Sequence, residues 1–519
     1  MQGDSQSNEV CKIDRDSGNL PLIKSPSPFS RNSEISLSRP LGIHKLRKAQ
    51  NKHLSHFVLI PFWDWHSNEK SLLRFCENNA KNFHWLTHFS FEAKYYSKLT
   101  RNRIIQTIKC LKAVQSLTHF KLVGRILVQS HLLVPLMRNF KRLQSITLDF
   151  SDYNVPPISR IFSALKNLMI RLKVIKLTFG YIWDPNNQLI KDLGPAISCL
   201  KHLKAICVEI YRTFFETSSC SKIAGVSSNW KDSEPALLLN FRPSDEKIGN
   251  QIFENIIQSI KHLPRLEQVV LSIGNGVSLE NQELERFSKE LPRKLKSLRV
   301  NLSKCQKVKK EGVLDFLTAI AKMSSLQDIS LKFSSQYQID DEFIKELLRC
   351  LNRQKRLESL FLSFEKCNTI TESALTQFLN VISSNLNLRS LMLCFIGSKK
   401  SLTDYGLGKL GIAIENLKRL EVLALNFSQG AQTTDKGINN LSARFGSLEK
   451  LKKLVLVFRD CINVRGEISG SLFKELGKLH NLESVILDFK LCKRLKKEDV
   501  QKILPCSRSI KYNLSVNFE

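Results

Sequence analysis

The feature that most constrains this chain is a stretch of sequence that returns about every 31 residues. Its template is L-x-x-[LIVF]-x-[LVF]-x-[FLI], and from Leu295 to Leu482 successive starts lie 31, 31, 31, 32, 31 and 31 residues apart. Clear starts occur at Leu143, Leu172, Leu203, Leu266, Leu295, Leu326, Leu357, Leu388, Leu420, Leu451 and Leu482. Weaker starts at Leu54, Leu86, Leu117, Glu234 and Lys511 bring the total to about sixteen repeats. Such a chain folds as a stack of similar units.

Each repeat is predicted to contain one strand and one helix. In LESLFLSFEKCNTITESAL, which begins at Leu357, the apolar residues Leu360, Leu362 and Phe364 alternate as in a strand with one apolar face. Thr371 is then a candidate helix N-cap, and the apolar residues after it have helical spacing. Because helices join successive strands, the strands must be parallel. The sequence therefore predicts an α/β solenoid with the sheet on its concave face and the helices on its convex face.

These repeats resemble a known family. CNTITESAL (367–375), SLTDYGL (401–407), TTDKGI (433–438) and CQKVKKEGV (305–313) resemble the long leucine-rich repeats of the ribonuclease-inhibitor-like and cysteine-containing types. The resemblance covers about 54–519 and implies a right-handed, horseshoe-shaped solenoid. The period of 31 exceeds the ~20–29 residues usual in this class. Cysteines at one shared repeat position are predicted to be buried fillers: Cys305, Cys367, Cys461 and Cys492.

Two segments lack the period. Residues 1–53 contain KSPSPFSRNSEISLSRP and HKLRKAQNKH, and they are predicted to form a disordered, basic tail before a solenoid over 54–519. Ser25 and Ser27 each precede a proline, which makes proline-directed phosphorylation a hypothesis. Residues 212–235 occupy one helix position but contain six serines. They are predicted to be either an excursion loop or an eroded repeat.

The chain is strongly basic, with a net charge of +31 and a pI near 9.7. This charge would attract nucleic acid, acidic membrane surfaces or acidic proteins. The start MQGDSQSNEV does not read as a secretory signal, and no run approaches the length of a membrane span. The 13 cysteines include no C-x-x-C pair, which favours reduced thiols. The sequence predicts a cytoplasmic protein, with a nuclear location as the alternative.

No motif predicts catalysis. GLGKLG (406–411) fits G-x-G-x-x-G, but Leu407, Leu410 and Ile414 have the spacing of an ordinary repeat helix, so nucleotide binding is not predicted. The sequence contains no phosphate-binding P-loop, G-x-S-x-G or H-E-x-x-H motif. A solenoid also offers no closed pocket by default. The chain is predicted to be non-catalytic and to need no cofactor.

Three histidines occupy one concave position in successive repeats: His56, His88 and His119. Neighbouring strands lie ~4.8 Å apart, so the three imidazoles could bind a metal or respond to pH. The alternative is repeated sequence with solvated histidines, and the pattern favours this alternative over a metal site.

The concave face is predicted to be the contact surface. Its five acidic and five basic residues balance, so the sequence does not predict a nucleic-acid track along the sheet. Most of the positive charge is assigned to helices, turns and rims. An apolar row crosses five successive strands, with two valines beside it: Phe361, Met392, Ala424, Val455 and Ile486, then Val422 and Val457. We expect this row to face solvent and to bind a protein partner.

The predicted function is therefore a non-catalytic, protein-binding scaffold. The resemblance implies two alternatives, a substrate-recognition subunit of a ubiquitin ligase and a regulator of a small GTPase. Residues 1–53 show no F-box-like pattern, which the first alternative needs. Nucleic-acid binding through the basic outer surface is a third alternative. The final strand-like stretch NLSVNF has no helix after it, so homodimerisation through its open edge is a further hypothesis.

Overall fold

The structure is a computed structural model with two compact units. It describes residues 33–37, 54–59, 86–93, 114–124, 140–150, 172–182, 188–210, 236–243, 246–274, 277–303, 305, 307–334, 339–367, 369–397, 403–466, 469–495 and 513–517. Unit 1 contains Met1–His202 and Asp232–Phe241, and unit 2 contains Leu203–Lys231 and Arg242–Glu519. Strands in each unit pair in parallel, as predicted.

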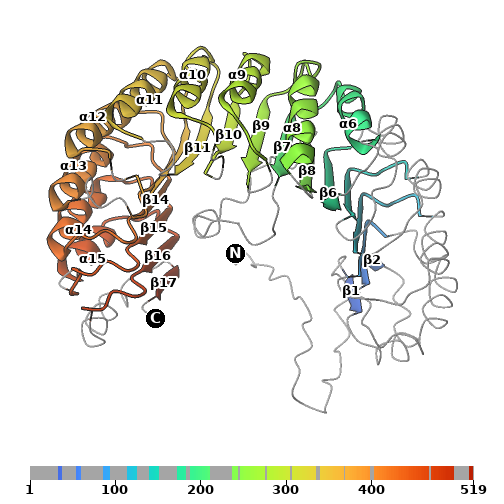
Figure 1. Cartoon of the computed structure of the whole chain (residues 1–519). Coiled ribbons are helices and arrows are strands. Elements are labelled where there is room, and N and C mark those ends of the chain that lie inside the picture. Colours follow the sequence, from blue (N-terminus) through green and yellow to red (C-terminus); the bar gives the residue numbers. More distant parts are fainter. Residues whose placement is uncertain are drawn as a thin grey trace. The chain divides into compact units, whose positions relative to one another are not determined.

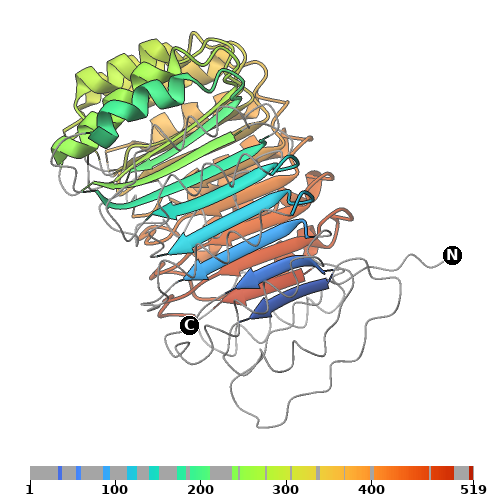
Figure 2. The same ribbon diagram turned by 90° about the vertical axis from the view of Figure 1, so that its right-hand side faces the viewer.

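Unit 1 is built on a parallel sheet, whose blue to green strands run side by side in Figure 2. Its elements are β1 (Ser33–Leu37), β2 (Leu54–Leu59), β3 (His88–Ala93), β4 (His119–Gly124), β5 (Ser145–Phe150), β6 (Val174–Ile182), α6 (Gln188–Ser198) and most of β8 (Ala236–Pro243). β1 pairs with β2 and lies within the segment predicted to be a disordered tail. That prediction is wrong for these five residues, because SEISL has the alternation of a short strand. The rest of 1–53, including Ser25 and Ser27, lies outside the described residues.

The order of strands departs from the order of the sequence at one point. β8 pairs with β6, where the backbone amide of Ala236 donates to the Lys173 carbonyl and Phe179 stacks on Phe241 at 4.9 Å. β7 (Ala205–Ile210) instead pairs with β9 (Gln268–Ile273) in unit 2. The chain therefore enters unit 2 for β7 and returns to unit 1 for β8. Residues 212–235, between these strands, lie outside the described residues.

Unit 2 has the strand–helix alternation that the repeat predicts. Its further strands are β10 (Ser297–Asn301), β11 (Asp328–Ser334), β12 (Ser359–Glu365), β13 (Ser390–Cys394), β14 (Val422–Asn426), β15 (Lys453–Val457), β16 (Ser484–Asp488) and β17 (Asn513–Asn517). Its helices are α8 (Glu246–Ile260), α9 (Asn281–Glu290), α10 (Lys310–Ile320), α11 (Asp341–Arg353), α12 (Glu372–Ser383), α13 (Asp404–Glu415), α14 (Asp435–Ser442) and α15 (Ser469–Leu476). Within this unit, the helices α9–α15 cover the outer face of the curved sheet, and none of the described helices lies on its inner face (Figure 1). The predicted leucine-rich-repeat solenoid is confirmed.

The core of unit 2 lies between the sheet and the helices. Template leucines such as Leu360, Leu391 and Leu423 stand in register on adjacent strands and are at most 1% exposed. From β11 to β16, the last inward position of each strand region carries a phenylalanine. These six residues, which we call the phenylalanine spine, are Phe333, Phe364, Phe395, Phe427, Phe458 and Phe489. Successive ring centroids are 5.4–6.3 Å apart, close enough for aromatic contact along the stack.

Side-chain hydrogen bonds join the starts of helices in adjacent repeats of unit 2. The predicted N-cap is confirmed, because the Thr371 hydroxyl accepts from the Ala374 amide at 3.2 Å. The Asp341 carboxylate, at the start of α11, accepts from the amide and hydroxyl of Thr371 at 2.9 and 2.7 Å. Asp404 accepts from the same two groups of Thr434 at 2.8 and 2.6 Å. Such contacts fix the stacking of adjacent helices.

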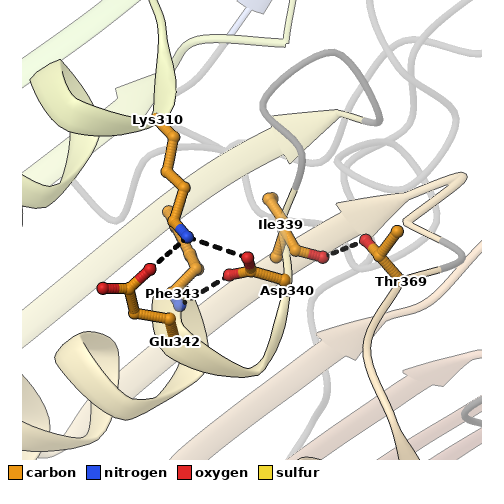
Figure 3. A network of polar contacts seen from close by, with 6 residues as sticks. All are labelled: Lys310, Ile339, Asp340, Glu342, Phe343 and Thr369. Carbon is orange, nitrogen blue, oxygen red and sulfur yellow. Dashed lines mark hydrogen bonds and ion pairs between the residues drawn. The ribbon is translucent and has the colours of Figure 1, made fainter.

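Between α10 and α11, the residue at the start of the first helix is a lysine, whereas α11 and α13 begin with an aspartate (Figure 3). Lys310 begins α10, where a cation opposes the helix dipole. Its ammonium group donates to Asp340, at 2.8 Å, and to Glu342. These hydrogen bonds raise the pKa of Lys310. Asp340 also accepts from the Phe343 amide at 3.0 Å, so one carboxylate both caps α11 and binds the preceding helix.

GLGKLG lies inside α13, as predicted, and not in a phosphate-binding loop. A Cβ on Gly411 would lie 3.0 Å from the backbone carbonyl oxygen of Leu441 in α14. The glycine therefore permits a close approach of two helices.

The repeat cysteines are buried as expected. Cys305, Cys367, Cys461 and Cys492 are at most 6% exposed. The thiol of Cys492 donates to the Phe458 carbonyl at 3.0 Å, and that of Cys461 to the equivalent Phe427 carbonyl at 3.4 Å. Burial raises the pKa of Cys367 and of Cys461 to about 12, so both thiols stay protonated at neutral pH.

Candidate interaction surface

The predicted apolar row exists as a contiguous cluster on the helix-free face of unit 2. Phe361, Met392, Ala424, Val455 and Ile486 are direct register partners on β12 to β16. Val457 belongs to the same cluster, and Val422 stands beside it on β14. We call these seven residues the apolar strip. It lies on the opposite face of the strands from the leucine core, because side chains alternate along a strand.

The strip is less exposed than the sequence predicted. Met392 and Ala424 are 8% exposed, and Val455 and Val457 only 1%. The expectation of a solvent-facing row is wrong for these four residues. Side chains in register on strands ~4.8 Å apart cover one another, and the inward curvature of the sheet brings them closer still.

Three members of the strip remain partly exposed. Phe361 and Ile486 pack against the ends of the buried group, and Val422 lies at its side. The strip therefore has a buried floor and an accessible border. This arrangement can hold apolar side chains of another molecule, and it contains no reactive group of its own.

The charges that flank the strip are paired. Arg299 Nε donates to Asp328 at 2.7 Å. Arg459 Nε donates to Asp488 at 2.7 Å, and Asp488 is itself 1% exposed. Lys332 lies 3.7 Å from Glu365. The five basic and five acidic residues assigned to the sheet face from the sequence do not include Arg459 or Glu365. Arg459 follows β15, and Glu365 is the last residue of β12. The flanks of the strip therefore carry charge pairs rather than one sign of charge.

One polar group beside the strip lacks a partner among the described residues. The Ser363 hydroxyl is buried, with its residue 1% exposed, and makes no hydrogen bond. It stands in register between Lys332 of β11 and Cys394 of β13. Sequence reasoning missed this feature, because the alternation pattern assigns Ser363 only to the sheet face.

The three predicted histidines do occupy one register position of unit 1. The rings of His88 and His119 stack with centroids 4.0 Å apart and an interplanar angle of 8°. Each Nδ1 also lies 2.8–2.9 Å from the hydroxyl of the preceding threonine. Stacked rings of this kind do not converge on one ion. Among the described residues, no group of three or more His, Cys, Asp or Glu side chains is placed to hold a metal.

A second apolar feature lies on the helices of unit 2. Tyr405 and Ile412 of α13 are 57% and 47% exposed, and the Lys409 ammonium lies 5.1 Å from the Tyr405 ring centroid. The sequence analysis did not identify this pair. The sequence pattern that could have indicated it is the i, i+7 spacing of two apolar residues outside the core-facing positions of the helix.

No family model and no curated protein matches the chain. A solved structure of the Rad7 and Elc1 complex in yeast is similar over 90% of both chains, with 15% identity and a TM-score of 0.43. The leucine-rich repeat-containing protein LegL7 from Legionella pneumophila is similar over 51% of this chain and 79% of its own, with 16% identity and a TM-score of 0.30. Among the described residues, no helix is long and apolar enough to cross a membrane.

Proposed function

We propose that this chain is a non-catalytic scaffold that binds a segment of a protein partner along the apolar strip of unit 2. The observation that supports this most is the in-register apolar cluster on the sheet face that carries no helices. Contact energy in protein interfaces concentrates in well-packed, desolvated apolar centres. The buried floor of the strip, bordered by Phe361, Val422 and Ile486, has this character.

The strip favours a partner of defined chemistry. It crosses five strands, a span of about 20 Å, which matches about six residues of an extended segment. The partner segment should present apolar side chains, since the strip offers apolar contacts and its flanking charges are paired. An extended segment or one amphipathic helix meets this requirement.

The test uses residues of the strip that are partly exposed. Phe361→Glu with Ile486→Glu places two charges at its accessible border. The matched control is Tyr405→Glu with Ile412→Glu, which makes the same chemical change on the outer helix α13. Met392 is unsuitable, because an aspartate or glutamate at a side chain 8% exposed would also destabilise the fold.

The immobilised proteins are used to capture partners from a native lysate in high salt, and we expect capture to require an intact strip. The strip variant should lose partners that the wild type and the control variant retain, with unchanged circular dichroism. Equal capture by all three proteins would refute the proposal.

A further inference from the structure

A second surface of unit 2 gathers positive charge. Eight turns join a helix to the next strand: 261–267, 291–296, 321–327, 354–358, 384–389, 416–421, 448–452 and 477–483. Together they contain fourteen Lys and Arg residues against five Asp and Glu residues. We call this edge of unit 2 the basic rim. The rim differs from the apolar strip, whose flanking charges are paired.

The repeat itself places these cations. The first leucine of the template is buried, and the two residues before it are exposed in most repeats of unit 2. Arg293 and Lys294 occupy these positions before β10, and Lys355 and Arg356 occupy them before β12. The repeat of β11 has Ser324 and Ser325 at these positions, and its turn contributes Lys322 instead. Because each strand is paired with the next, the turns follow one edge of the sheet, and every turn carries at least one Lys or Arg.

Acidic residues on the rim do not interrupt the row. Glu421 accepts from Arg389 at 2.7 Å and from Lys452 at 2.8 Å, so one carboxylate is shared by cations of two repeats. Glu267 likewise contacts Lys204 at 4.0 Å and Lys296 at 2.6 Å. These contacts span neighbouring repeats, and an excess of positive charge remains on the rim.

We propose that the basic rim binds the phosphate backbone of single-stranded nucleic acid. An edge with at least one cation in every turn matches a flexible polymer with regularly spaced negative charges. The eight turns contain no Phe, Tyr or Trp on which bases could stack, so binding is independent of base sequence. An anionic membrane fits less well, because it favours a broad face with inserted apolar residues. Leu386 is the one large hydrophobic residue found exposed in these described turns.

The net charge of the chain does not locate its cations, and the sheet face does not provide a basic track. The basic rim is separate from both the sheet face and the outer surface of the helices.

The test measures binding of the full chain to a fluorescein-labelled 20-nucleotide oligouridylate by anisotropy, between 50 and 300 mM KCl. With one phosphate neutralised per turn, the slope of log K against log salt should be about −5 to −6 for the wild type. The rim variant combines Arg293→Glu, Lys294→Glu, Lys355→Glu and Arg356→Glu. Its substitutions lie in two turns, so it should lose about 1.4 from the magnitude of the slope and bind at least about tenfold more weakly at 100 mM KCl.

A matched control distinguishes binding at the basic rim from an effect of net charge alone. Exposed lysines on four helices give the variant Lys247→Glu, Lys345→Glu, Lys436→Glu and Lys474→Glu, which has the same net charge as the rim variant. It should bind almost as tightly as the wild type. Equal losses in the two variants would overturn the proposal, and so would displacement of the oligonucleotide by polyglutamate as effectively as by unlabelled RNA. The strip variant Phe361→Glu with Ile486→Glu should keep its affinity for RNA, so the two surfaces are tested independently.

Discussion

Phe395 lies in the middle of the phenylalanine spine, and its replacement by alanine is expected to weaken unit 2 locally. The side chain is 1% exposed and lies between the rings of Phe364, at 5.4 Å, and Phe427, at 6.3 Å. Truncation of a buried phenylalanine costs about 3–5 kcal/mol, because it removes apolar contacts and leaves a cavity. Phe395→Leu keeps most of the apolar volume and loses the ring contacts, so it should cost about 1–2 kcal/mol.

The loss should be concentrated near the altered repeat. Stability in a repeat protein is approximately a sum of terms within repeats and between neighbours. Amides of β12, β13 and β14 should therefore exchange with deuterium about 100-fold faster or more in Phe395→Ala, since each 1.4 kcal/mol corresponds to a factor of ten. Amides of β9 and β10 should change much less.

The assay is hydrogen exchange followed by mass spectrometry, with Ile412→Ala as the control in the same repeat. Ile412 is 47% exposed, so its truncation should change exchange by less than about threefold. Wild-type protection of β12 to β14 in Phe395→Ala would refute the role of the spine. Wild-type protection in Phe395→Leu would refute the contribution of the ring contacts.

Three further predictions concern the buried cysteines, the contact between Asp404 and Thr434, and the backbone at Leu491. Burial raises the pKa of Cys367 and of Cys461 to about 12, so the stability that their protonated thiols contribute is complete below pH 9 and is lost as pH rises towards 12. Between pH 9 and 10.5, the urea midpoint should fall more steeply in the wild type than in the double alanine variant, and equal slopes would contradict this. Asp404→Ala removes two hydrogen bonds to Thr434 and should lower the free energy of unfolding by about 2 kcal/mol, with a smaller loss for Asp404→Asn. An unchanged urea midpoint would show that this joint is not stabilising. Leu491 has φ 64° and is 65% exposed, so Leu491→Gly should stabilise the fold by up to about 1 kcal/mol in thermal unfolding, and a lowered melting temperature would argue against backbone strain there.

The sequence predicted the repeating architecture because each repeat carries its own physical pattern. The alternation of Leu360, Leu362 and Phe364 identified the strand, and Thr371 marked the start of the helix. A constant period then required equivalent residues to stack, which is how the structure forms its leucine core and its phenylalanine spine. Local patterns were sufficient for these elements, because each repeat contacts mainly its neighbours.

Other features depend on neighbours that no local pattern specifies. The alternation placed Val455 on the sheet face but could not show that adjacent strands cover it to 1% exposure. The pairing of β8 with β6 is also non-local, since both repeats have the same strand pattern. The partner of Asp488 is Arg459, which lies two residues beyond β15 and outside the strand positions counted in the sequence.

Dimerisation through β17 stays a prediction. β17 pairs with β16, as the stretch NLSVNF suggested. A monomeric mass by light scattering at micromolar concentration would argue against pairing through its other edge.

Site-specific photocrosslinking can detect a protein partner in direct contact with the apolar strip. A photoreactive amino acid would replace Phe361 or Ile486 on the strip, or Tyr405 or Ile412 on α13, with irradiation in a native lysate at high salt. A discrete protein adduct is expected from the two strip positions and none from the two helix positions. Adducts that form only from α13, or no adduct from either strip position, would contradict this expectation.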